Sequence, residues 1–144
     1  MKLIKNKKLI FRFDIGNKDG LGHYNRSLIL IKYFLKKKYT IKICTNTKSK
    51  IFFSKQLQKL IFLKNRNETE DKYIGRISLK FANYIIFIDK LHDYKKKEIL
   101  NLKINNQVIF IQNFSKSSLI ADKIIFPEIH NNVKIKKNKV YAGL

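Results

Sequence analysis

The chain has 144 residues, 44% of them hydrophobic, which suits one domain with its own core. The single cysteine, Cys44, excludes a disulfide framework and a cysteine zinc site, and we expect it to be a small buried residue. The formal net charge of +22 comes almost wholly from lysine, and no apolar run approaches the roughly 20 residues that span a bilayer.

The first predicted unit is a strand, a glycine-containing loop and a helix. Residues 9–13 form the strand, which Asp14 bounds, the loop extends from Ile15 to Gly22, and the helix begins at His23. Helical periodicity places four apolar side chains on one face, namely Tyr24, Leu28, Ile31 and Leu35. Ser27 and Lys32 are turned away from that face. Such a unit directs free backbone N–H groups and the positive helix end toward one crevice, which predicts an anionic or hydroxyl-rich ligand.

Strands and helices alternate along the rest of the chain. Further strands are predicted at 39–44, 60–63, 84–88, 108–111 and 123–126, and helices at 51–57, 71–83, 94–102 and 115–121. The unbroken apolar run at 84–88 predicts a strand buried on both faces. Residues 131–139 are basic and predicted to form a loose surface segment. The alternation predicts an α/β fold, a single Rossmann-like domain over 1–144 with a doubly wound parallel sheet.

A doubly wound strand order of 3-2-1-4-5 has its switch point between the first strand and the 84–88 strand. The loops 15–22 and 89–93 then face one crevice at the carboxyl edge of the sheet. We therefore expect Asp14, His23, Arg26 and Asp89 to cluster there, with His23 at a helix start.

Each of these four residues has a chemical and a structural interpretation. At a helix N-terminus the dipole favours a neutral imidazole, so His23 is the candidate for proton transfer; a capping or sugar-binding role is the alternative. Arg26 could reach a substrate carboxylate or hydroxyl, or pair with Asp14 to fix the loop. Asp14 and Asp89 end strands and could accept hydrogen bonds from sugar hydroxyls or brace the turns that follow them.

No resident metal or cofactor is predicted. His92 and Asp93 lie near the crevice by topology, where a helix-start role is expected, and His130 has no second ligand at metal spacing. The glycine loop lacks the Lys-Ser/Thr of a P-loop, and Asn25 stands where a Rossmann fingerprint has its third glycine. No acidic residue ends the second strand to hold a ribose, which argues against NAD.

The block Arg12-x-Asp14, followed by Gly20-x-Gly22-His23-x-x-Arg26, resembles the N-terminal domain of the PseG/SpsG family. These are nucleotide-sugar hydrolases and relatives with a GT-B fold similar to MurG. The resemblance implies the N-terminal, sugar- or acceptor-side half of a GT-B enzyme in surface-polysaccharide or nonulosonic acid biosynthesis. It also implies that the C-terminal nucleotide-binding domain is absent from 1–144, and a separate chain that carries this domain is one candidate partner.

The resemblance also assigns site residues. His23 matches the family histidine that positions or activates the attacking water. The other implied contacts to a nucleotide sugar, expected to be UDP-linked, are Asp14, Asn17, Gly20, Leu21, Gly22, Arg26 and Asp89. The chain departs from the family pattern where Lys90-Leu91 follows Asp89 and where Gln112-Asn113 follows the fifth strand.

Other classes of function stay open at this point. One is a non-catalytic binding or scaffold domain, or a truncated remnant of an enzyme. The basic composition also permits peripheral contact with an anionic membrane. The start of the chain, interrupted by Arg12 and Asp14, is not a convincing secretion signal, so we expect a cytoplasmic protein.

A specific nucleic-acid partner is not expected, because the chain has no helix-turn-helix, zinc-finger or RNP-like aromatic motif. We expect its binding to a random-sequence DNA duplex to be weak and to be almost abolished at moderate salt, since only phosphate contacts would support it. A salt titration of duplex binding checks this. Sequence-selective, salt-resistant binding would contradict it.

Overall fold

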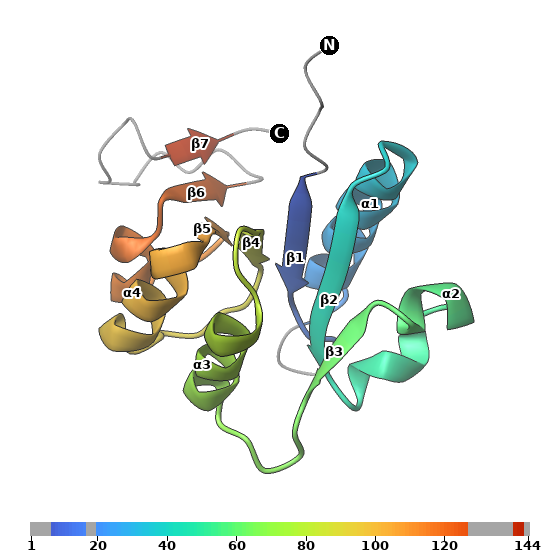
Figure 1. Ribbon diagram of the computed structural model, residues 1–144, viewed down its shortest axis with the longest axis horizontal. Helices are drawn as coiled ribbons and strands as arrows, with labels where there is room; N and C mark the ends of the chain where they lie inside the picture. The colour runs from blue at the N-terminus through green and yellow to red at the C-terminus, as the bar shows by residue number, and fades with distance from the viewer. Residues whose placement is uncertain (1–6, 17–19, 127–139, 143–144) are drawn as a thin grey trace.

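The computed structural model describes residues 7–16, 20–126 and 140–142 (Figure 1). They form a seven-stranded sheet, all parallel, in the order β3-β2-β1-β4-β5-β6-β7. The order contains the predicted 3-2-1-4-5 arrangement and confirms the doubly wound α/β fold. No helix in the described part of the chain is long and apolar enough to cross a membrane.

The strands are β1 (Lys8–Arg12), β2 (Thr40–Asn46), β3 (Ile61–Lys64), β4 (Ile85–Ile88), β5 (Gln107–Ile111), β6 (Lys123–Phe126) and β7 (Val140–Ala142). The α-helices are α1 (Gly22–Lys36), α2 (Lys55–Gln58), α3 (Glu70–Lys80) and α4 (Lys96–Asn105). Two 3₁₀ helices complete the described elements, η1 (Ser49–Phe52) and η2 (Lys116–Ile120).

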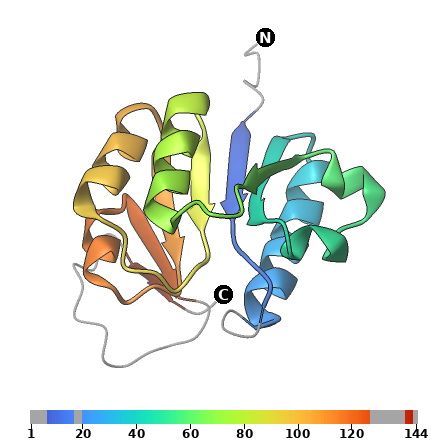
Figure 2. The same cartoon turned by 90° about the horizontal axis from the view of Figure 1, so that it is seen from below.

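Each face of the sheet has its own hydrophobic cluster. On one face α3 and α4 pack over the sheet, and residues such as Ile77 and Leu102 meet Ile86 and Phe110. On the other face α1 packs with Ile31 against β1 and β2, and α2 contributes to the same cluster. Figure 2 shows these two helical layers on opposite sides of the sheet. Among the described residues the helices of the α1 side lie mainly over β1, β2 and β3.

Several boundaries differ from the sequence prediction. The helix expected at 51–57 is two short pieces, η1 and α2, because Phe53 is extended and the Ser54 side chain caps α2 by accepting from the Leu57 N–H. α3 ends at Lys80 rather than Asn83, since Phe81 is extended and Asn83 has a φ of 65°. β7 was not predicted; its three residues pair with β6. The predicted loose segment 131–139 lies outside the described residues.

Two burial predictions are wrong. The 84–88 run is not buried on both faces: in β4, Ile86 and Ile88 are fully buried, whereas Ile85 and Phe87 are half-buried on the side where α1 gives only partial cover. Ser27, predicted to turn away from the core, is fully buried on α1, and its hydroxyl has no hydrogen-bond partner within the described part of the chain. A small side chain at this position lets the helix approach the sheet closely.

Cys44 lies inside β2 and is fully buried, as predicted. Burial raises the pKa of its thiol to about 12. We expect a thiol reagent at pH 8 not to react with Cys44 in the folded state, because the thiolate forms only when β2 is exposed. Labelling should therefore proceed at the rate at which the protein unfolds. Because the pKa of this thiol is higher in the folded state than in the unfolded state, the free energy of unfolding should fall as the pH rises from about 9 toward 12. Rapid labelling without denaturant would contradict this.

Candidate functional site

The switch point lies between β1 and β4, which are adjacent and parallel. Asp14 follows β1, Asp89 follows β4 directly, and His23 is the second residue of α1. The Asp89 N–H donates to the Arg12 carbonyl at 2.8 Å, which joins the ends of the two strands. The predicted gathering of Asp14, His23, Arg26 and Asp89 at the carboxyl edge of the sheet is therefore what the structure shows.

The centre of the site is the Asp89 carboxylate, which is 1% exposed and accepts from both functional residues of α1. Arg26 donates to it twice, from Nε to Oδ2 at 2.5 Å and from Nη2 to Oδ1 at 2.7 Å. Nδ1 of His23 makes a short contact with Oδ1 of the same carboxylate. Because His23 and Arg26 are three residues apart, one helical turn presents both to a single strand end.

The tautomer of His23 follows from these contacts. Nη2 of Arg26 also lies 3.0 Å from Nδ1 of His23, and that nitrogen cannot both donate to Asp89 and accept from Arg26. We assign Nδ1 as the donor, because the two Arg26 donors already face Asp89 oxygens. The lone pair then resides on Nε2, which meets no hydrogen-bond donor among the described residues. This arrangement suits a general base held by a carboxylate.

Asp14 is saturated by partners of its own. Both of its oxygens face the Arg12 guanidinium, at 2.6 and 2.7 Å, and Lys90 donates to Oδ2 at 2.9 Å. The alternative prediction that Arg26 pairs with Asp14 is wrong: Arg26 reaches Asp89, one strand further along the sheet. Asp14 therefore braces the end of β1, and its carboxylate is fully engaged by protein donors.

Sequence reasoning missed the core of this bracing network, which is Arg12 with Glu70. Arg12 is fully buried and donates to Glu70 from Nε and Nη2, at 2.8 and 2.6 Å. Tyr94 also donates to Glu70, at 2.9 Å. Burial, followed by the neighbouring Glu70, raises the pKa of the Tyr94 hydroxyl well above its usual value. The sequence resemblance includes Arg12 only as a family position, and the signal for its buried partner is a charge inside an apolar strand.

One residue of the glycine loop, Gly20, has a backbone conformation that requires glycine. Gly20 has a φ of 67°, and its N–H donates to the Gly16 carbonyl at 2.8 Å, closing a turn. A Cβ on Gly22 would lie 4.0 Å from Nη1 of Arg26, so the guanidinium extends over the helix start. Leu21 precedes α1 and is 60% exposed, with no side-chain cap on the helix. Asn17, predicted to contact substrate, lies outside the described residues.

The remaining polar residues near the crevice have structural partners. His92 lies near Asp71, with Nε2 and Oδ2 3.5 Å apart, although Nε2 has no hydrogen bond in the described part of the chain, and Asp93 accepts the Ser117 N–H at 3.2 Å. The role predicted for them at the start of the following helix is wrong: α4 begins at Lys96 without a side-chain cap, and the two residues contact α3 and η2 instead. His130 lies outside the described residues.

Acid unfolding should reveal the Asp14 network. Burial alone would raise the pKa of Asp14, but Arg12 and Lys90 hold it well below its usual value. A lowered folded pKa stabilises the fold above the unfolded pKa of about 3.9, and this contribution is lost as the pH falls below that value. We expect Asp14→Asn to cost about 2–3 kcal/mol of unfolding free energy at pH 7 and to flatten the loss between about pH 4 and pH 2.

Urea unfolding at several pH values measures this effect. Glu98→Gln is a control of equal charge change, because the Glu98 side chain has no hydrogen bond or ion pair among the described residues. An unchanged acid slope in Asp14→Asn would show that other carboxyl groups dominate acid unfolding.

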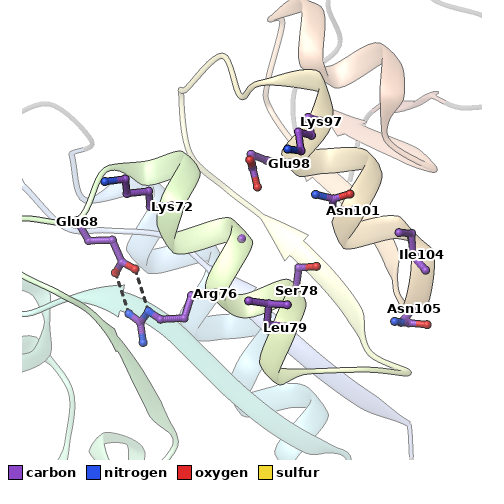
Figure 3. Close-up of a pocket in the computed structure, with 11 residues that line it drawn as sticks. Glu68, Lys72, Arg76, Ser78, Leu79, Lys97, Glu98, Asn101, Ile104 and Asn105 are labelled. Atoms are coloured by element: carbon purple, nitrogen blue, oxygen red, sulfur yellow. Dashed lines mark hydrogen bonds and ion pairs between the residues drawn. The ribbon is translucent and has the colours of Figure 1, made fainter.

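A second hollow, of about 830 Å³, lies between α3 and α4, away from the crevice (Figure 3). Its polar side chains come from both helices, and Arg76 pairs with Glu68 at its side. Gly75 opens room for Glu98, whose Oε2 would lie 3.1 Å from an added Cβ. This hollow gathers no histidine and no strand-end carboxylate, so the carboxyl edge of β1 and β4 is the better candidate site.

No protein-family model, curated protein or solved structure matches this chain.

Proposed function

We propose that this chain is the sugar- or acceptor-side domain of a nucleotide-sugar hydrolase or related glycosyltransferase of the PseG/SpsG type. The observation that carries the proposal is the contact of His23 with Asp89 at the switch point, with Arg26 clamping the same carboxylate. This geometry leaves Nε2 of His23 as a proton acceptor beside the glycine loop. The matching sequence block supplies the substrate class, a UDP-linked sugar in polysaccharide or nonulosonic acid biosynthesis.

In the hydrolytic reaction, water attacks the anomeric carbon while the bond from that carbon to the diphosphate oxygen breaks. Nε2 of His23 takes the proton that the water loses, and the nucleoside diphosphate leaves with the bonding electron pair. Asp89 stays ionised and holds the imidazole in orientation. In a transferase an acceptor hydroxyl replaces the water. Positive charge develops on the sugar ring in the transition state, as in glycoside hydrolysis generally.

The carboxyl edge also supports the expectation of a second domain. Three loops there each present a large apolar side chain with more than half of its surface exposed: Leu21 at 60%, Leu91 at 62% and Phe114 at 56%. Apolar side chains around a polar crevice suit a covering surface that excludes water from the reaction. In a GT-B enzyme that surface belongs to the nucleotide-binding domain, so we expect residues 1–144 alone to be inactive.

The test follows nucleotide release from several UDP-sugars by residues 1–144, alone and with a supplied C-terminal GT-B half. We expect turnover only in the mixture and its loss in His23→Ala. His92→Ala is the matched control, because that imidazole faces Asp71 and not Asp89. Turnover by the isolated chain that His23→Ala abolishes would show a complete single-domain hydrolase. Absence of His23-dependent turnover in every mixture would refute the proposed reaction.

A further inference from the structure

A groove of about 540 Å³ lies beside α1 on the sheet face opposite α3 and α4, and we name it the α1 groove. Its helical wall consists of Ile29, Leu30 and Phe34, and Arg26 is its one charged lining residue. Its floor is the sheet, with Phe87 from β4, Ile111 from β5 and Ile125 from β6. The register of these strands puts the three floor residues on one face.

The exposed side of α1 carries unusual apolar surface. Ile29 is 68% exposed and Tyr33 is 54% exposed, and their spacing of four residues puts them on one side of the helix. They do not face the core, because Ser27 and Ile31 fill that side and are fully buried. A helix that is apolar on a second side is typical of one with a second packing neighbour.

The position of the groove indicates the shape of that neighbour. Helices in a doubly wound fold lie side by side over the sheet, each about 10 Å wide and so covering about two strands. On this face the described helices cover β1, β2 and β3, and the α1 groove continues the layer over β4, β5 and β6. One further helix laid parallel to α1 would contact the wall and the two half-buried floor residues, Phe87 and Ile125.

The charge around the groove indicates the composition of that helix. None of the four elements that line it, α1, β4, β5 and β6, contains an aspartate or glutamate. The one charged residue that lines the groove, Arg26, already binds Asp89, and the positive charge that a partner meets is that of the whole chain, formally +22. A partner helix that docks in this groove would bind more tightly if acidic residues flanked its apolar stripe.

Two other occupants are less favoured by the same observations. A second copy of this chain would bring another +22 of formal charge to the interface, and like charges repel. A flat bilayer surface could reach Ile29, which is 68% exposed, but not the recessed and half-buried floor residues Phe87 and Ile125. A concave apolar groove is instead the usual receptor for one amphipathic helix.

We propose that the α1 groove is the docking site for an acidic amphipathic helix of a partner chain. The inference goes beyond the proposed reaction, because it concerns a surface outside the crevice and is tested without turnover. A docked helix would meet Arg26, which holds Asp89 and through it His23. Docking would thereby tie the orientation of the candidate base to the presence of the partner.

The experiment measures binding of a fluorescent helical peptide of about 14 residues, with leucines at i, i+3, i+4 and i+7 and glutamates elsewhere, to the full chain in 150 mM salt. A scrambled peptide of the same composition has the same charge but no apolar stripe. Ile29→Glu places a charge at the groove, and Leu79→Glu makes the same charge change on α3, where that side chain is 91% exposed. Both side chains are exposed enough that neither variant should prevent folding.

We expect the patterned peptide to bind better than the scrambled one, Ile29→Glu to weaken it at least about tenfold, and Leu79→Glu to change it less than about twofold. Equal effects of the two variants would overturn the proposal, because binding would then follow net charge alone. Dimerisation of the free chain that Ile29→Glu abolishes would assign the groove to a second copy. Ile29-dependent binding of phosphatidylserine vesicles or decanoate without peptide binding would assign it to lipid.

Discussion

Replacing Arg12 with methionine is expected to destabilise the fold by about 3–5 kcal/mol, which is a large part of the 5–15 kcal/mol that holds a typical domain together. The guanidinium is fully buried and faces two carboxylates, Asp14 and Glu70, that are themselves almost fully buried. Methionine keeps the apolar volume over the Tyr73 ring, which Arg12 now contacts at 5.1 Å from Cζ to the ring centroid. The cost therefore comes from two buried negative charges that lose their common partner.

The matched control is Arg76→Met. Arg76 also pairs with a carboxylate, Glu68, but its side chain is 32% exposed, and an exposed pair contributes about 0–1 kcal/mol. Urea unfolding at pH 7 compares the two variants. If Arg12→Met does not fold, the triple variant that adds Asp14→Asn and Glu70→Gln should recover folding, because it removes the unpaired charges. Equal stability of Arg12→Met and Arg76→Met would refute the role assigned to the buried network.

Under the proposed reaction, Asp89→Asn is expected to lower kcat for UDP-sugar hydrolysis by residues 1–144 with a supplied C-terminal half by about 10²–10⁴-fold, the range of general-base catalysis. The asparagine amide can donate to Nδ1 of His23, which would move the ring proton to Nε2 and remove the acceptor for the water proton. Arg26 would lose the carboxylate that binds it twice, so a fall in stability of about 2–3 kcal/mol should accompany the loss of activity.

Two measurements distinguish a loss of the His23 ring orientation from a general loss of protein stability. The nitrogen chemical shifts of His23 report which ring nitrogen carries the proton, and we expect Nδ1–H in the parent and Nε2–H in Asp89→Asn. Lys90→Met is the companion variant from the same loop, since Lys90 contacts Asp14 and not the histidine. Full activity of Asp89→Asn with an unchanged tautomer would show that Asp89 only braces the strand end.

The sequence by itself determined the parallel sheet, the strand order around β1 and β4, and the meeting of His23 with Asp89. Each of these follows from local signals. Apolar runs of four to six residues mark the strands, glycines and a helical period mark the loop and α1, and chain handedness then places consecutive units. Strand-end residues meet at the carboxyl edge because all strands are parallel, whatever the details of packing.

Only the tertiary structure decided which charges pair and which faces stay exposed. Arg12 meets Glu70 across 58 residues because α3 begins beside the end of β1, and no local pattern specifies where a helix start comes to lie. Arg26 reaches Asp89 rather than Asp14 because Arg12 and Lys90 already occupy Asp14. The α1 groove has the same origin: it depends on where neighbouring helices stop covering the sheet, a relation between distant elements that short-range periodicity does not carry.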